Sequence, residues 1–181
     1  MKQIAYTSII IGTFVALNTV SVSVNSGTLK KEHLVKHTKQ KSPLYKTEKV
    51  KVSVKEQDCL AKNIFYEAGI ESRIGKIAVA QVTHNRLKTG QWGSTICKVV
   101  YARSQFSWTL DKKKRNATPK GSLWLESREV AKEFLAGIRV KSLETSKFYH
   151  TSYIKTPKWV DSTKKIQTIG QHIFYTSAKI A

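Results

Sequence analysis

Glu67 is the residue whose type and position most directly suggest chemistry. The segment 58–69 has the periodicity of an amphipathic helix, with an apolar face formed by Leu60, Ile64 and Ala68. Glu67 falls inside that face, and burial raises the pKa of a carboxyl group because it disfavours the charged form. A carboxyl that keeps its proton near neutral pH can act as a general acid. The alternative is a structural glutamate that reaches solvent or pairs with a buried cation such as Arg86.

A second carboxylate, Glu71, follows this helix and directly precedes the next one. We expect a helix over 72–87, because Ser72 is a good N-cap and apolar residues then recur at helical spacing. Glu71 therefore belongs to the turn between two helices. Two roles fit this position equally: it orients a substrate near Glu67, or it caps a helix or forms an ion pair.

Two segments combine aromatic faces with hydrogen-bonding side chains, a mixture that suits a substrate-binding surface. The residues are Tyr101, Gln105, Phe106 and Trp108 in the first segment, and Tyr149, His150 and Trp159 in the second. The same mixture of polar and aromatic residues is also typical of a half-buried strand whose rings belong to the core. Both interpretations stay open at this point.

The chain of 181 residues is expected to have three parts. Residues 1–29 begin with a short cationic start followed by a long uncharged, mostly apolar stretch, which is typical of an export signal or of a membrane anchor through residues 4–24. A buried core helix is the alternative. Residues 30–57 are rich in lysine with little periodicity and predict a flexible basic tether. Residues 58–181 contain all four Trp and are expected to form the folded catalytic domain.

The formal net charge of the chain is +20, from 32 Lys and Arg against 12 Asp and Glu. Such an excess predicts an anionic partner. With an export signal, the expected location is the periplasm or cell envelope, where the partners would be peptidoglycan and anionic envelope surfaces. Nucleic acid is not expected as a partner, because it is scarce in that compartment. The apolar share of 40% excludes a wholly disordered chain.

Cys59 and Cys97 are the two cysteines of the chain. In an exported protein an isolated pair most often forms a disulfide, which here would connect the Glu67 helix to the Cys97 segment. The alternative is that both stay reduced and buried. A cysteine nucleophile is disfavoured, because the sequence places no activating histidine beside either residue.

Further secondary structure is expected toward the C-terminus. Residues 122–136 have the apolar spacing of a packing helix that ends before Gly137. Residues 148–151 and 172–175 are rich in aromatic and β-branched residues and predict short strands.

A series of motifs runs in order along residues 59–175. The motifs are Leu60-Ala61, Tyr66-Glu67-Ala68, Glu71, Gly75, Ala78-Val79-Ala80, Asn85-Arg86, Ile96-Cys97-Lys98-Val99-Val100-Tyr101, Gln105-Phe106-Ser107-Trp108, Phe148-Tyr149-His150-Thr151, Pro157-Lys158-Trp159 and Ile169-Gly170-Gln171-His172-Ile173-Phe174-Tyr175. Together they resemble the SleB-type cell-wall hydrolases, the spore cortex-lytic enzyme family. The resemblance implies an α+β fold with a lysozyme-like core of several helices and a small antiparallel β element. It also implies Glu67 as the catalytic residue, with no cofactor or metal.

The activity implied by the resemblance is cleavage of peptidoglycan glycan strands, by a lytic transglycosylase or a muramidase-type glycosidase. Glu67 would protonate the glycosidic oxygen through an oxocarbenium-like transition state. A second carboxylate or the sugar's own C6 hydroxyl would complete the reaction. The spacing of Asp111, Glu126 and Asp161 singles out none of them, and the resemblance favours a transglycosylase with one glutamate.

Two other classes of function stay open. A zinc-dependent peptidoglycan amidase would draw its ligands from His84, His150 and His172, although no H-E-x-x-H or comparable pairing is present. An exported polyanion-binding protein is permitted by the charge alone.

Overall fold

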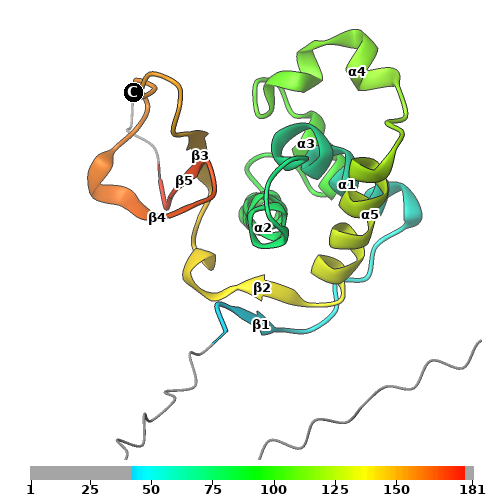
Figure 1. Ribbon diagram of the computed structural model, residues 1–181, viewed down its shortest axis with the longest axis horizontal. Coiled ribbons are helices and arrows are strands. Elements are labelled where there is room, and N and C mark those ends of the chain that lie inside the picture. The colour runs from blue at the N-terminus through cyan, green and yellow to red at the C-terminus, as the bar shows by residue number, and fades with distance from the viewer. Residues whose placement is uncertain (1–41, 178–181) are drawn as a thin grey trace, which may run out of the picture. The chain divides into compact units, whose positions relative to one another are not determined.

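The computed structural model describes residues 42–177, which form an α+β domain of helices and two small antiparallel sheets (Figure 1). The α-helices are α1 (Val54–Ala68), α2 (Arg73–Thr89), α3 (Ile96–Tyr101), α4 (Lys112–Asn116) and α5 (Ser122–Leu135). The strands are β1 (Leu44–Lys46), β2 (Ile138–Val140), β3 (Phe148–Thr151), β4 (Lys165–Ile169) and β5 (His172–Tyr175). The fold class expected from the sequence is confirmed.

The helices pack around α1, which contacts α2, α3 and α5. Ser53 starts α1 by accepting a hydrogen bond from the Glu56 amide, and Ser72 does the same for α2. The core between them contains fully buried side chains, among them Leu60, Ile64, Ile77, Val82 and Phe134. Each such side chain contributes about 1.5–3 kcal/mol through burial. The helices predicted over 72–87 and 122–136 are confirmed as α2 and α5.

The segment before α1 belongs to the folded domain, so the predicted boundary at Asp58 is wrong. β1 pairs with β2 in antiparallel register, with Leu44 opposite Val140. The Val50 amide then donates a hydrogen bond of 2.8 Å to the Leu135 carbonyl. Leu44 and Val50 of this segment pack against the core while its lysines stay exposed. A short edge strand tolerates lysines because its outer face is solvated, which is why composition alone suggested a tether.

The predicted export segment 1–29 and residues 30–41 of the predicted tether lie outside the described residues. Within residues 42–177, no helix combines the length and apolar character needed to cross a membrane.

The second sheet has the strand order β3–β5–β4, with both pairs antiparallel. β3 and β5 coincide with the strands predicted over 148–151 and 172–175, so both predictions are confirmed. Tyr149 lies opposite Phe174, and Phe174 is fully buried in the core. This pairing anchors β3 beside the helices and sets the position of Tyr149.

Cys59 and Cys97 form a disulfide, as expected. The bond joins α1 to α3 and therefore ties the helix that carries Glu67 to a second element. Closing a loop of this length removes freedom from the unfolded chain worth about 4 kcal/mol in the chain-entropy description.

Candidate active site

Glu67 lies in the last turn of α1, where its carboxyl group faces β3. The Tyr149 hydroxyl donates a hydrogen bond of 3.0 Å to Glu67 Oε2. Burial raises the pKa of Glu67 above its ordinary value of 4.5, while the Tyr149 hydrogen bond and the charge of Arg86 act in the opposite direction. Because burial dominates, the carboxyl keeps its proton to a higher pH than a solvated glutamate would. This is the property that a general acid requires.

Arg86 is not a direct ion-pair partner of Glu67. Among residues 42–177, no cation lies within ion-pair distance of this carboxylate. The Arg86 guanidinium instead lies 5.1 Å from the ring centre of Phe106 and 5.7 Å from that of Phe148. Its Nε donates a 2.8 Å hydrogen bond to the Lys147 carbonyl. Its charge therefore acts on Glu67 at longer range, and the carboxyl is not locked into a salt bridge.

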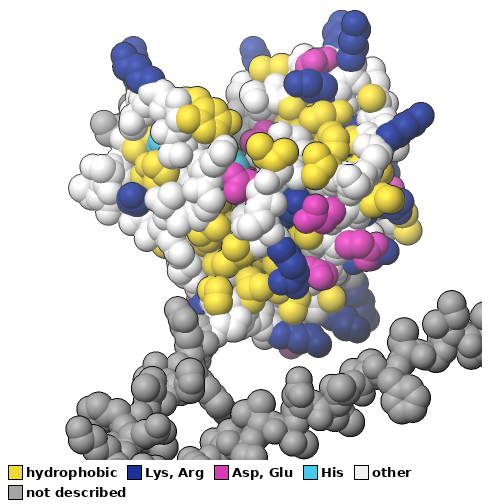
Figure 2. Space-filling view, viewed as in Figure 1, with side chains coloured by type: hydrophobic (Ala, Val, Ile, Leu, Met, Phe, Trp, Pro, Cys, Tyr) yellow, Lys and Arg dark blue, Asp and Glu magenta, His cyan; other side chains and the backbone are white. Residues whose placement is uncertain are grey.

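Glu67 lies where two adjoining hollows meet, and together they form what we call the Glu67 groove. The larger part has a volume of about 560 Å³ and the smaller part about 220 Å³. The residues that line both parts are Tyr66, Glu67, Thr151 and Tyr153. Figure 2 shows the surface hollowed between the side formed by the β3–β5–β4 sheet and the side formed by α4. A linear polymer in this groove would extend past Glu67 in both directions.

Aromatic side chains line the larger part of the groove, and Trp108 and Trp159 of the predicted substrate-contacting residues are among them. Trp108 is only 5% exposed, and its Nε1 donates a 3.0 Å hydrogen bond to Asn63 Oδ1. The Tyr66 ring stacks on Trp108 with 4.6 Å between ring centres, and it also lines the groove. Trp108 therefore supports the Tyr66 ring, which offers a further aromatic face to the groove. The sequence did not single out Tyr66, although it directly precedes Glu67.

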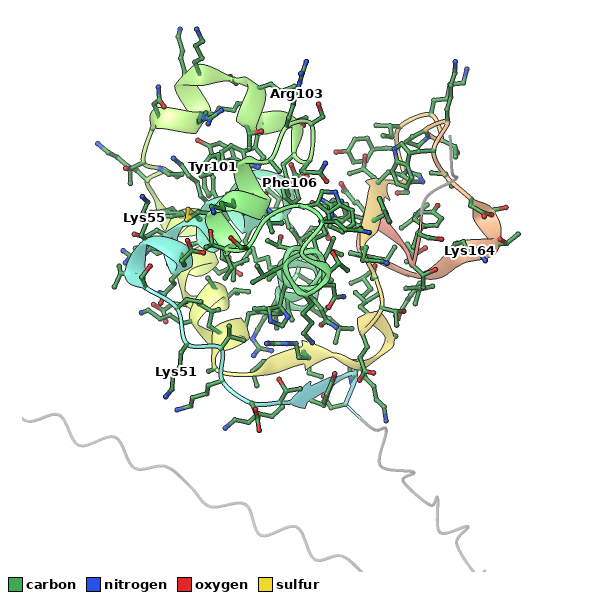
Figure 3. The ribbon with its side chains drawn as sticks, turned by 180° about the vertical axis from the view of Figure 1, so that it is seen from behind. Lys51, Lys55, Tyr101, Arg103, Phe106 and Lys164 are labelled. Carbon is green, nitrogen blue, oxygen red and sulfur yellow. A yellow bond between two sulfur atoms is a disulfide. The ribbon has the colours of Figure 1, made fainter. Side chains whose placement is uncertain are left out.

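Three of the predicted substrate-contacting residues do not line either part of the Glu67 groove. Tyr101 lines a separate hollow with Lys62, and Phe106 is a core residue, 3% exposed (Figure 3). The Gln105 amide donates to the carbonyl of Arg103 in its own loop. For Phe106 the structure supports the core alternative but not the strand. Its ring is covered by the Arg86 guanidinium, and the segment continues as the short helix η1 (Ser107–Leu110).

His150 lines the larger part of the groove, but both of its ring nitrogens are engaged within the protein. Nδ1 lies 2.9 Å from the Thr151 carbonyl oxygen and Nε2 lies 3.0 Å from the Tyr175 hydroxyl. A carbonyl only accepts, so Nδ1 carries the hydrogen and Nε2 accepts from Tyr175. The ring also stacks on Tyr175. These contacts indicate that His150 holds β3 in place below Tyr149.

Glu71 joins the turn after α1 to the turn between β4 and β5, and it lines the smaller part of the groove. Its Oε1 accepts a 3.1 Å hydrogen bond from the Gln171 amide and lies 3.4 Å from His172 Nδ1. A Cβ atom at Gly170 would collide with Oε2, so the close approach requires glycine there. Burial lowers the pKa of His172. The contacts of Glu71 are those of a residue that positions one end of the groove.

Asp111, Glu126 and Asp161 are the three carboxylates that the sequence could not choose between as a second catalytic group. Of these, Asp111 lines the larger part of the groove. Its Oδ1 accepts hydrogen bonds from the Lys113 and Lys114 amides, which caps α4. Glu126 instead forms a 2.7 Å ion pair with the buried Lys76, and Asp161 Oδ1 accepts from the Thr163 amide. An aspartate directly before a lysine run is a recognisable helix start, but only the tertiary fold brings it to the groove.

The histidines do not support the zinc hypothesis. Among residues 42–177, no three side chains of the His, Cys, Asp and Glu types are grouped to hold a metal ion. His84 lines a different hollow, while His150 and His172 have the contacts described above.

Comparisons with known proteins identify the family and the fold. A family model described as Cell Wall Hydrolase matches residues 70–175, a range that begins just after Glu67. Among curated proteins, a spore cortex-lytic enzyme of Oceanobacillus iheyensis is 27% identical over 118 residues. That match covers 64% of this chain and 39% of the relative, so the chain spans well under half of the relative's length.

Two solved structures share the fold. The catalytic domain of the Bacillus cereus SleB protein has a TM-score of 0.59 and 22% identity, covering 69% of this chain and 92% of that one. The catalytic domain of the germination-specific lytic transglycosylase SleB from Bacillus anthracis has a TM-score of 0.58 and 23% identity, covering 68% of this chain and 96% of that one. The resemblance seen in the sequence motifs is confirmed.

Proposed function

The chain belongs to the cell wall hydrolase family, and on that premise we propose that it cleaves the glycan strands of peptidoglycan with Glu67 as general acid. The observation that carries the proposal is the position of Glu67. Its carboxyl is largely buried, has a raised pKa and lies in the middle of a groove that continues on both sides. Glycoside cleavage needs such an acid to protonate the leaving oxygen.

In the first step, the Glu67 carboxyl gives its proton to the glycosidic oxygen as the bond from that oxygen to C1 breaks. The sugar passes through an oxocarbenium-like transition state. Because Tyr149 donates to Oε2, the transferable proton belongs on Oε1 and the carboxyl is held in one orientation. Glu67 is left as a carboxylate, which the Tyr149 hydrogen bond and the charge of Arg86 stabilise.

For the second step we propose the transglycosylase route. The Glu67 carboxylate accepts the proton of the sugar's C6 hydroxyl as that oxygen attacks C1, which leaves a 1,6-anhydro end. A muramidase would instead direct water to C1 with a second carboxylate. Asp111 is the other carboxylate in the larger part of the groove, and its hydrogen bonds to two α4 amides suit a helix cap. These contacts support a single-glutamate mechanism.

Mass spectrometry of the muropeptides released from purified sacculi tests this function. The expected products are glycan fragments with 1,6-anhydro ends, released equally in the presence of EDTA. Reducing ends would reject the transglycosylase route while keeping glycan cleavage. Release of free peptides with intact glycan strands would reject glycan cleavage and favour the zinc-dependent amidase instead.

The proposed place of action is the cell envelope, reached through the export segment 1–29. Peptidoglycan is the proposed partner, and the excess of Lys and Arg would also attract anionic envelope surfaces. Fractionation of cells that produce the full chain checks this, since a protein confined to the cytoplasm would contradict it.

A further inference from the structure

A second hollow, of about 830 Å³, shares no lining residue with the Glu67 groove. It lies between the segment 45–51, the C-terminal half of α2, and the residues around β2 and the following short helix η2 (Lys141–Leu143). Its volume falls within the range of small-ligand sites. The proposed glycan chemistry makes no use of it.

Arg139 is the buried cation of this hollow, only 5% exposed. Its Nη1 donates to the carbonyls of Phe134 and Ile138, which fixes the guanidinium in place. Within residues 42–177, no acidic side chain pairs with it, and its Nε and Nη2 have no hydrogen-bond partner. A fixed guanidinium edge with free donors is suited to the two oxygens of a carboxylate or phosphate.

Three lysines line the hollow together with Arg139, and none forms an ion pair with a residue that the structure describes. They are Lys49, Lys51 and Lys88. Lys49 and Lys51 flank Val50, whose backbone is hydrogen-bonded to Leu135, so their positions are fixed by the fold.

His84 is a buried histidine that lines the hollow. It is 8% exposed, and its Nδ1 is buried without a hydrogen-bond partner in the described part of the chain. Burial, followed by the charges of Arg139 and Lys88, lowers the pKa of His84 to about 4. The imidazole therefore stays neutral at neutral pH, so the positive charges of the hollow are those of Arg139 and the three lysines.

The lining also carries two acids, Glu48 and Glu144. Glu144 accepts a 2.7 Å hydrogen bond from the Tyr45 hydroxyl, and neither acid forms an ion pair with the four cations. A hollow with separate positive and negative groups matches a zwitterion better than a purely anionic polymer. The charge pattern therefore favours a peptide that carries carboxylates and a free amine over a phosphate chain.

We propose that this hollow is a non-catalytic site that binds the peptide stems of peptidoglycan, which carry several carboxylates and a free amine. The inference rests on the proposed function, because it takes its ligand from the same polymer. Binding a stem here would hold the enzyme on its substrate while the Glu67 groove takes a glycan strand, an arrangement that raises the effective concentration of the strand.

The test uses the full chain with Glu67→Gln, so that binding is measured without cleavage. The double variant Lys49→Glu/Lys51→Glu is compared with Lys164→Glu/Lys165→Glu, which makes the same charge change at two exposed lysines elsewhere. Figure 3 shows Lys51 and Lys164 on opposite sides of the domain. Calorimetric titration with the free tetrapeptide stem should give a Kd about tenfold weaker for the first pair only.

Equal Kd values for the two double variants would overturn the proposal. So would binding of polyphosphate, but not of the tetrapeptide, that depends on Lys49 and Lys51. The measurement is independent of glycan cleavage. A chain that binds the tetrapeptide through this hollow yet releases nothing from sacculi would keep the peptide-binding site and reject the glycosidase.

Discussion

In the proposed mechanism, Glu67 must hold a proton before glycan cleavage and tolerate a negative charge after it. Burial provides the first condition by raising the pKa of the carboxyl, while Tyr149 and Arg86 provide the second by stabilising the carboxylate. The absence of a direct salt bridge among the described residues matters here, because a paired cation would hold the carboxyl ionised. The pKa of Glu67 is thus set by opposing effects that separate substitutions can distinguish.

Tyr149→Phe tests the contribution of the Tyr149 hydrogen bond, which lowers the pKa of Glu67 against the effect of burial. Removing a hydrogen bond that lowers the pKa of Glu67 should raise that pKa further, so the alkaline limb of the pH–activity profile should move to higher pH. Turnover should also fall by about 10- to 100-fold, because the carboxyl loses its fixed orientation. Initial rates on soluble glycan across a range of pH measure both effects.

Tyr153→Phe is the matched control, since Tyr153 lines the same groove and is 72% exposed. This substitution should leave the alkaline limb in place. If Tyr149→Phe left it in place too, or moved it to lower pH, Tyr149 would not act through the carboxyl.

The sequence singled out Glu67 as a candidate because a carboxylate on an apolar helix face conflicts with its surroundings, and the helical periodicity alone reveals that conflict. The groove's other residues gave no such signal. Phe106 and Trp108 belong to one aromatic segment, yet one lies in the core under Arg86 and the other supports Tyr66 at the groove. Which ring faces substrate depends on tertiary contacts that composition does not encode.

At the scale of elements, α1 connects the core, the disulfide and Glu67. The prediction of α2, α5, β3 and β5 succeeded because each has a strong period or composition over its whole length. β1 was missed because it has three residues and a lysine-rich neighbourhood, and because its partner β2 lies far along the chain. Short edge strands of this kind are determined by pairing more than by local preference.

Replacing both Cys59 and Cys97 by serine tests the link between α1 and α3. Losing a cross-link worth about 4 kcal/mol should lower the melting temperature by about 10 °C or more. Reductant should lower that of the wild type similarly, as differential scanning calorimetry would measure. The disulfide would be contradicted if reductant left the wild-type melting temperature unchanged under conditions in which it can reach the sulfur atoms of Cys59 and Cys97.

Gly137→Ala tests whether the segment with β1 is part of the fold. Gly137 has φ +105°, and a Cβ atom there would collide with the carbonyl oxygen of Thr47, which follows β1. The substitution should destabilise the domain by about 1–3 kcal/mol or more, because it combines backbone strain with displacement of β1.

Gly90→Ala provides the comparison in the same chemical denaturation experiment. Gly90 also has a positive φ, of +71°, but open space surrounds its missing Cβ, so only the backbone cost of about 1 kcal/mol applies. Equal losses for the two variants would mean that the segment with β1 does not pack as described.

At the scale of the whole molecule, the Glu67 groove and the second hollow are separate surfaces on one strongly basic domain. If charge holds the enzyme on the wall, binding of the full chain to sacculi should weaken steeply as salt rises. The Debye length falls from about 10 Å at 0.1 M to about 3 Å at 1 M. Cleavage of short peptide-free glycans should change much less, because the proton transfer from Glu67 occurs within the groove. Equal salt dependence of pelleting and of soluble cleavage would contradict this separation.

Glu67→Gln is the substitution that tests Glu67 as the general acid. Stability supplies the first readout. With its pKa raised in the folded state, Glu67 contributes stability that is complete below about pH 4.5 and is lost as pH rises through the folded pKa. The glutamine variant lacks this loss, so it should gain stability relative to the wild type as pH rises through that window, and it should remain folded at neutral pH.

Activity supplies the decisive readout. Glutamine keeps the size of the side chain and an acceptor for Tyr149 but has no proton to give, so release of glycan fragments from sacculi should fall by about 10²- to 10⁴-fold or more. Glu71→Gln and Asp111→Asn, assayed alongside, should lose much less. If folded Glu67→Gln retained more than about a tenth of wild-type activity while one of the other two lost it, the account of Glu67 would be contradicted.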